Sequence, residues 1–198
     1  MKATLFVLAL LVHNVHSDDR AENLKHFNSG RSVWAKGLQI ANMNELVYLP
    51  KLEKVLYNQL ALTGGCPDSR IIYDASNPEI LVEIHLNVKY AKDERDVLKL
   101  YGGAGSTHMG YVETKCMVTG EEVKSWAFYK TNIFFSKDPE IHGPPGSKCS
   151  SGRSATSDGL CALEKSYTRK VMESYWDRIK RPIGGKHRSP GIFGTMDN

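Results

Sequence analysis

The chain has 198 residues, of which 41% are hydrophobic and 24% are charged, and this is enough to build the core of one domain. Its formal net charge is +4, from 26 basic and 22 acidic residues, and so weak a bias does not favour nucleic acid as a partner. After the first residues, no segment is apolar over the roughly twenty residues that a bilayer span needs, so we expect no transmembrane segment.

The first residues have the features of a secretory signal peptide. Lys2 precedes an apolar run over residues 3–12, and Val15-His16-Ser17 places small side chains at the positions that signal peptidase reads. We predict cleavage after Ser17, which assigns residues 1–17 to the signal peptide and leaves a secreted, extracellular mature chain. A buried helix beginning in the apolar run is the alternative, and the polar residues that follow favour export over it.

Four cysteines, Cys66, Cys116, Cys149 and Cys161, remain in the mature chain. In an exported protein this even number predicts two disulfides, in one of three possible pairings. The short loop between Cys149 and Cys161, rich in Ser and Gly, favours a bond between these two, and Cys66 would then pair with Cys116; the other pairings remain open. A zinc site is a less favoured alternative because no two cysteines have C-x-x-C spacing.

Two helices are predicted first in chain order. The apolar spacing over residues 21–36 predicts a helix that ends at Gly37. A second helix begins at Pro50, a favoured first-turn residue, carries its leucines on one face and stops at Gly64-Gly65.

The next elements are predicted from alternation and turn residues. Residues 71–73 and 80–88 read as strands, although the second run also fits part of a helix. A short helix is expected over residues 92–101, followed by a glycine-rich loop up to Gly110.

The sheet is expected to have its centre in the following hairpin. Residues 111–118 and 124–135 are rich in aromatic and β-branched side chains on either side of a turn. Residues 138–159 are expected to be irregular, and apolar residues at every fourth position predict a helix over residues 163–180. Basic and aromatic residues over 165–188 would suit an anionic glycan, a membrane or an acidic partner, but a solvated helix face is the simpler interpretation.

Two segments near the beginning carry a family pattern. They read Phe27-Asn28-x-x-Arg31-x-x-x-Ala35-x-Gly37 and Asn42-Met43-x-x-Leu46-x-Tyr48-x-x-x-Leu52-Glu53. In this order and spacing the chain resembles the CAP superfamily (SCP/TAPS), and most closely its divergent, secreted nematode branch related to ASP proteins. The cysteine-containing segments 146–151 and 157–161 resemble the hinge that closes many of these proteins.

The resemblance implies an α+β fold. We expect a three-layer α-β-α sandwich in residues 18–145, with a disulfide-stapled hinge and a basic extension in residues 146–198. It also implies a secreted, non-enzymatic binding protein without a cofactor. Such a protein would act in extracellular or host–parasite interaction on an unknown protein or lipid partner, and we expect it to be a monomer.

The family often has a cleft in which two His and two acidic side chains hold a divalent metal. This sequence departs from that pattern, because Phe27 stands where the family has His and the acidic G-E-N segment is missing. Only His108 could stand for the His of the family's G-H-[FY]-[TS]-Q segment, and the residues after His108 do not match that segment. From the residues alone, Glu83 and His85 lie two apart on a predicted strand and are candidates for a metal or acid–base cluster with His108. A solvated strand face is the simpler interpretation.

We predict no catalytic residues, because no serine has a G-x-S-x-G context and the cysteines are assigned to disulfides. Two alternatives to the binding protein remain. One is a metal-assisted hydrolase that uses Glu83, His85 and His108, and the other is a secreted carrier of a lipid or sterol.

Overall fold

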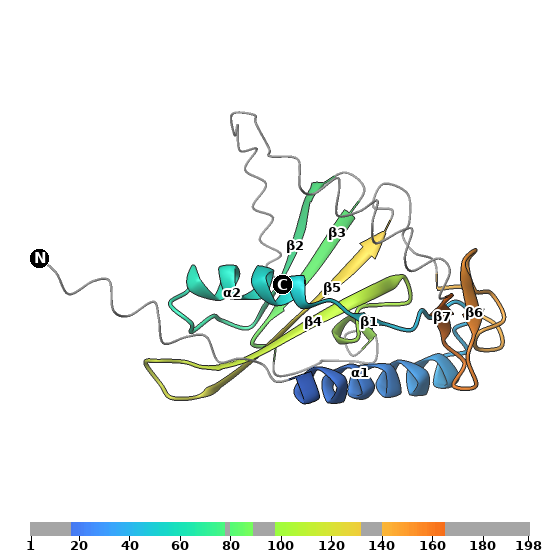
Figure 1. The fold of residues 1–198 in the computed structure, drawn as a ribbon, viewed down its shortest axis with the longest axis horizontal. Coiled ribbons are helices and arrows are strands. Elements are labelled where there is room, and N and C mark those ends of the chain that lie inside the picture. The colour runs from blue at the N-terminus through green and yellow to red at the C-terminus, as the bar shows by residue number, and fades with distance from the viewer. Residues whose placement is uncertain (1–16, 78–79, 89–97, 132–139, 165–198) are drawn as a thin grey trace, which may run out of the picture. The chain divides into compact units, whose positions relative to one another are not determined.

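The computed structural model describes residues 17–77, 80–88, 98–131 and 140–164 (Figure 1). Its elements in chain order are α1 (Ser17–Gly37), β1 (Val47–Tyr48), α2 (Pro50–Ala61), β2 (Arg70–Asn77), β3 (Ile80–Leu86), β4 (Ser106–Lys115), β5 (Glu122–Thr131), β6 (Arg153–Ala155) and β7 (Cys161–Leu163). The chain divides into one unit that ends at Leu163 and a second unit from Glu164 onward. The predicted signal peptide lies outside the described residues except for Ser17, as do residues 92–97 of the predicted short helix and the C-terminal helix and extension beyond Glu164.

The five strands β1 to β5 form a mixed sheet. Their order is β1-β4-β5-β3-β2, with β1 parallel to β4 and all other neighbours antiparallel. The hairpin β4–β5 therefore lies in the middle of the sheet, as the sequence predicts. Strand β3 pairs with β2 and β5 along its length, so its run of apolar residues is a strand and the helical alternative is excluded.

The two helices cover opposite faces of this sheet, which confirms the α+β fold with three layers (Figure 1). Phe27 of α1 contacts the rings of Trp126 and Phe128 on β5. The residue between these two, Ala127, points to the other face, because side chains alternate along a strand. There it pairs with Gly110, whose Cα lies against Leu52 of α2.

Each helix contributes a stripe of buried side chains at helical spacing. In α2, Leu52, Leu56 and Leu60 are buried, four residues apart, and Pro50 begins the helix at a position where no backbone N–H is needed. In α1 the buried stripe is Phe27, Arg31 and Ala35, so a charged residue lies where the pattern of a core helix would place an apolar one.

The prediction of a glycine-rich loop up to Gly110 is wrong for residues 106–110, which belong to a strand. Strand β4 begins at Ser106, and residues 106–109 are buried. Gly110 is required by packing rather than by a turn, because a Cβ atom built there would lie 2.6 Å from Leu52 Cβ and 3.1 Å from the Glu53 backbone nitrogen. A glycine in a strand often marks such a close approach of another backbone.

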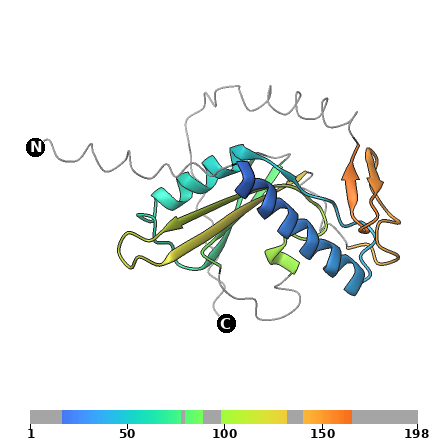
Figure 2. The same ribbon diagram turned by 60° about the horizontal axis from the view of Figure 1, so that its bottom comes forward.

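Two disulfides are present, as the sequence predicts, and they join Cys66 to Cys116 and Cys149 to Cys161. The first ties the segment after α2 to the end of β4. The second joins Cys149, which precedes β6, to Cys161 at the start of β7. Strands β6 and β7 form a small two-stranded sheet, so the segment predicted to be irregular contains a short strand over residues 153–155. This small sheet lies beside the C-terminal end of α1, where Ser32 Oγ donates a hydrogen bond to the Asp158 carbonyl oxygen (Figure 2).

Candidate functional site

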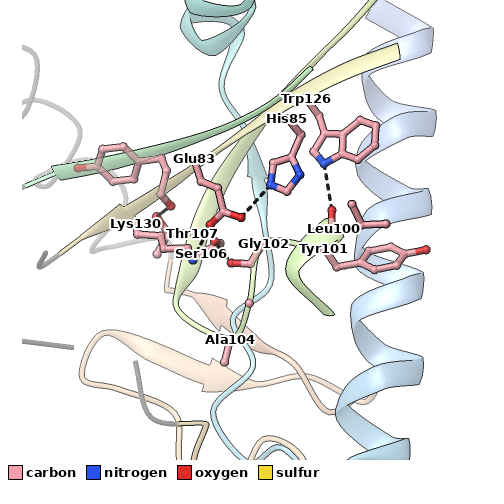
Figure 3. Close-up of polar contacts among 12 residues, drawn as sticks. Glu83, His85, Leu100, Tyr101, Gly102, Ala104, Ser106, Thr107, Trp126 and Lys130 are labelled. Atoms are coloured by element: carbon pink, nitrogen blue, oxygen red, sulfur yellow. Dashed lines mark hydrogen bonds and ion pairs between the residues drawn. The ribbon is translucent and has the colours of Figure 1, made fainter. Parts of the chain in front are cut away.

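Three charged or titratable side chains meet on the face of the sheet that α1 partly covers (Figure 3). Glu83 and His85 both belong to β3, two residues apart, and therefore point to the same face. Lys130 comes from the neighbouring strand β5. The Glu83 carboxylate lies between the other two: its Oε1 is 2.8 Å from His85 Nε2, and its Oε2 is 2.8 Å from Lys130 Nζ.

The cluster is buried except at its lysine end. The side chain of His85 is 0% exposed and that of Glu83 is 3% exposed, whereas that of Lys130 is 23% exposed. The imidazole ring of His85 is stacked on Trp126 and meets Phe128 edge to face. Trp126 is itself fixed by a hydrogen bond of 3.0 Å from its Nε1 to the Leu100 carbonyl oxygen. The rings thus hold His85 in one orientation.

The Glu83 carboxyl is kept ionised by its neighbours. Burial alone would raise its pKa, but the hydrogen bond from His85 and the positive charge of Lys130 outweigh burial and hold the pKa of Glu83 below its ordinary value. A buried carboxylate that is held ionised by two donors is a stable arrangement. The negative charge of Glu83 is therefore balanced by Lys130 and by the hydrogen bond from His85.

His108, the third candidate, is not part of this cluster. It pairs with Tyr129, whereas Glu83 pairs with Phe128, one residue along β5, so the two side chains point to opposite faces of the sheet. The imidazole of His108 lies edge to face with the ring of Tyr129, and its Nδ1 is 2.9 Å from Thr107 Oγ1. Within the described residues, no three His, Cys, Asp or Glu side chains are placed to hold a metal ion.

The other polar residue at the centre of the fold is Arg31, whose role the sequence does not reveal. Its side chain is fully buried, and its guanidinium donates hydrogen bonds to five backbone carbonyl oxygens, those of Asn44, Tyr101, Gly103, Ala104 and Ser106. Burial, and then the charge of Arg153, lowers the pKa of Arg31 to about 9, so the group stays charged at neutral pH. Arg31 thus fixes the segment between Tyr101 and Ser106, beside the Glu83 cluster.

A second ion pair fixes the beginning of α1. Arg20 forms two parallel hydrogen bonds to the carboxylate of Glu53 in α2, at 2.7 and 2.8 Å. Glu53 also accepts a hydrogen bond of 2.8 Å from the Tyr48 hydroxyl. Bidentate contacts of this kind add directional precision to the charge attraction, and here they join α1, β1 and α2.

Three of the six large apolar side chains that are exposed in the described residues lie near one disulfide. Leu62, Met117 and Val118 are 79%, 65% and 87% exposed, and each lies within four residues of Cys66 or Cys116. The turn that carries Met117 and Val118 is closed by hydrogen bonds from Gly120 N to Cys116 O and from Cys116 N to Glu121 O. We call these three exposed side chains the hairpin tip (Leu62, Met117 and Val118); the turn that carries two of them is fixed by its own hydrogen bonds and by the disulfide.

Comparison with known proteins gives one line of structural evidence. No family model and no curated protein matches the chain. A solved structure titled "Crystal Structure of Hookworm Platelet Inhibitor" superposes with a TM-score of 0.53 over 80% of this chain and 97% of that chain. The two share a fold. Their sequence identity is 16%, and at this level the likeness to hookworm platelet inhibitor concerns the fold alone.

None of the described helices is long and apolar enough to cross a bilayer.

Proposed function

We propose that the chain is a secreted, non-enzymatic protein of the CAP type, related to the nematode branch, which acts by binding a protein on the surface of host cells. Three observations support this proposal. The motifs around Arg31 and Glu53 resemble that family, the fold is shared with hookworm platelet inhibitor, and the four cysteines form two disulfides, which are typical of exported proteins.

The contacts of the Glu83 cluster support the proposal that the protein is not an enzyme. A general base or a metal ligand needs a lone pair that is available to substrate or metal. Both carboxylate oxygens of Glu83 instead accept hydrogen bonds from His85 and Lys130, and the His85 ring is covered by Trp126 and Phe128. Glu83 is therefore occupied by its two donors, whereas His85 Nδ1 is buried without a hydrogen-bond partner in the part of the chain that the structure describes.

The hairpin tip is the surface that we assign to binding. Methionine is enriched at protein interfaces, and a contact loop that is rigid before binding loses less entropy when it binds. Met117 and Val118 have both properties, since they project from a turn whose base is held by the Cys66–Cys116 disulfide.

Saturable binding of the labelled, secreted protein to washed platelets tests the proposal, with platelets chosen because of the comparison above. We expect binding that is lost when the platelets are treated with protease, when the protein is reduced, or when Met117 and Val118 are replaced by Glu. The exposed apolar residue Val33 on α1 offers a matched control, and Val33→Glu should bind as the wild type does.

Two other results would overturn the proposal in favour of one of its alternatives. Hydrolysis that is abolished by a chelator, in a preparation without saturable binding, would support the metal-assisted hydrolase. Binding that survives protease treatment and follows the lipid content of the cells, with lipid in extracts of the pure protein, would support the lipid or sterol carrier.

A further inference from the structure

We infer that β2 is a dimer interface, at which two copies of this chain pair their β2 strands antiparallel about a two-fold axis at Ile72. The inference concerns an edge of the sheet that the proposed function does not use, since no residue of the hairpin tip belongs to β2. It departs from the monomer that we expect from the family resemblance.

The position of β2 in the sheet gives the first step. In the part of the chain that the structure describes, β2 is an outer strand, which pairs with β3 along one side and with no strand along the other (Figure 1). Such an edge presents backbone N–H and C=O groups that can bind another strand, and natural proteins often block it with lysine, proline or a bulge. The sequence of β2 contains neither lysine nor proline.

The regular part of the strand gives the second step. Residues 70–74 pair with β3 without interruption, and the register shifts only between Asp74 and Asn77. Ile72 is the centre of this regular segment. Two copies that meet about a two-fold axis at Ile72 would use the same segment on both sides, as a symmetric dimer requires, and neither bulge would interrupt the pairing.

The charges at the two ends of this segment give the third step. Pairing about Ile72 places Arg70 of each copy opposite Asp74 of the other, because both residues lie two positions from the axis. Both side chains are exposed and they carry opposite charges. The dimer therefore gains two cross-strand ion pairs, which are a favourable arrangement on the surface of a sheet.

The residues between the charges are apolar and match in the same register. Ile71 of each copy lies opposite Tyr73 of the other, and the two Ile72 side chains lie opposite each other. Tyr73 is 57% exposed, and both isoleucines are partly exposed. Pairs of an aromatic and a β-branched side chain stabilise neighbouring strands, so the dimer would cover apolar surface that a single copy leaves in water.

The neighbouring registers are less favourable, which selects the axis at Ile72. An axis at Ile71 would bring Asp68 of one copy opposite Asp74 of the other, and like charges in this position destabilise a sheet. An axis at Tyr73 would place Asp74 opposite the apolar Ile72. Of these three registers, only the axis at Ile72 joins opposite charges.

Sedimentation velocity of the full mature chain over a range of concentrations tests the inference. We expect a reversible monomer–dimer equilibrium that strengthens at low salt, because salt screens exposed charge pairs. Asp74→Arg and Arg70→Asp each turn both ion pairs into repulsions and should weaken the dimer by about tenfold or more. Lys25→Asp, which makes the same change of charge at an exposed position on α1, should dimerise as the wild type does.

Mixing the two single variants separates lost charge complementarity from misfolding. Asp74→Arg has two positive charges along this edge and Arg70→Asp has two negative charges, so the mixture should form a heterodimer although each variant alone stays monomeric. The double variant exchanges the two charges and should dimerise with itself. Hydrogen exchange of the wild type needs no variant, and amides within residues 70–74 should be more protected at high protein concentration than at low.

A wild type that stays monomeric up to its solubility limit would overturn the inference. A dimer that persists in both single variants, or a mixture of the folded variants that forms no heterodimer, would overturn it as well. Loss of the dimer when Met117 and Val118 are replaced by Glu, but not in Asp74→Arg, would assign self-association to the hairpin tip instead. Platelet binding by Asp74→Arg shows separately whether the proposed function stands, because the hairpin tip is unchanged in this variant.

Discussion

Lowering the pH from 7 to 5 is expected to destabilise the fold through His108. This side chain is 7% exposed, and its Nε2 is buried without a hydrogen-bond partner in the part of the chain that the structure describes. Burial, and then the positive charge of Arg153, lowers the pKa of His108 to about 4, from an ordinary value of 6.5. In this pH range, the unfolded chain therefore takes up a proton that the folded protein rejects.

The sign and size of the effect follow from linkage. The contribution of His108 is fully present above its unfolded pKa and is lost as the pH falls through the folded value, because the unfolded state binds more protons in between. At about 1.4 kcal/mol for each pH unit between the two values, the loss approaches about 3 kcal/mol, of which about 2 kcal/mol is lost between pH 7 and pH 5. Glu83 acts at lower pH, because its pKa is held below the ordinary carboxyl range.

Urea unfolding at pH 7, 6 and 5 measures this loss. The matched variant is His108→Gln, which keeps a polar side chain beside Thr107 but does not titrate. The free energy of unfolding of the wild type should fall by about 2 kcal/mol more than that of the variant over this range. Equal losses in the two proteins would refute the assignment, since the other histidines are common to both.

Three further substitutions test the packing of the fold by urea or thermal unfolding. Gly110→Ala should lower the free energy of unfolding by about 1–3 kcal/mol, because the new Cβ would clash with α2. Gly37→Ala is the control and should leave the free energy of unfolding nearly unchanged, because no atom lies within 4 Å of its new Cβ. Equal effects of the two substitutions would contradict the packing argument. Arg31→Met should cost more than about 3 kcal/mol, because it leaves buried carbonyl groups without donors, and a stable variant would refute this role. Replacing Cys66 and Cys116 by Ser should lower the free energy of unfolding by up to about 4 kcal/mol, and replacing Cys149 and Cys161 by about 3 kcal/mol. The difference arises because the first disulfide joins cysteines 50 residues apart and the second joins cysteines 12 residues apart. The reverse order would be inconsistent with loop-closure entropy.

The sequence predicts the parts of the fold whose residue pattern is visible within a short stretch of chain. Pro50 and the leucines after it locate α2, and alternation over residues 80–86 locates β3. The start of β4 was missed because glycines near residue 105 and at Gly110 read as a loop. Gly110 is needed because α2 approaches the strand there. This contact joins segments nearly sixty residues apart, so it produces no periodic pattern in the sequence around the glycine.

In the candidate site, too, only the local relations could be predicted from the sequence. Glu83 and His85 are two apart on one strand, so their shared face follows from the sequence, and their hydrogen bond is a local consequence of it. Lys130 is added by the pairing of β3 with β5, and the position of His108 depends on the register of β4. Register is set by the whole sheet, so neither relation could be read from residue spacing alone.

The motif around Arg31 shows why a family resemblance carries more information about fold than about chemistry here. Asn28 bonds both the backbone N–H and the carbonyl group of Leu46, and Arg31 binds five carbonyl oxygens, those of Asn44 and of four residues between Tyr101 and Ser106. Both residues satisfy backbone groups that would otherwise be buried without partners, a need that any chain with this topology has whatever it binds. The exposed side chains of the hairpin tip satisfy no buried backbone group, so this part of the surface can differ between proteins that keep the motif.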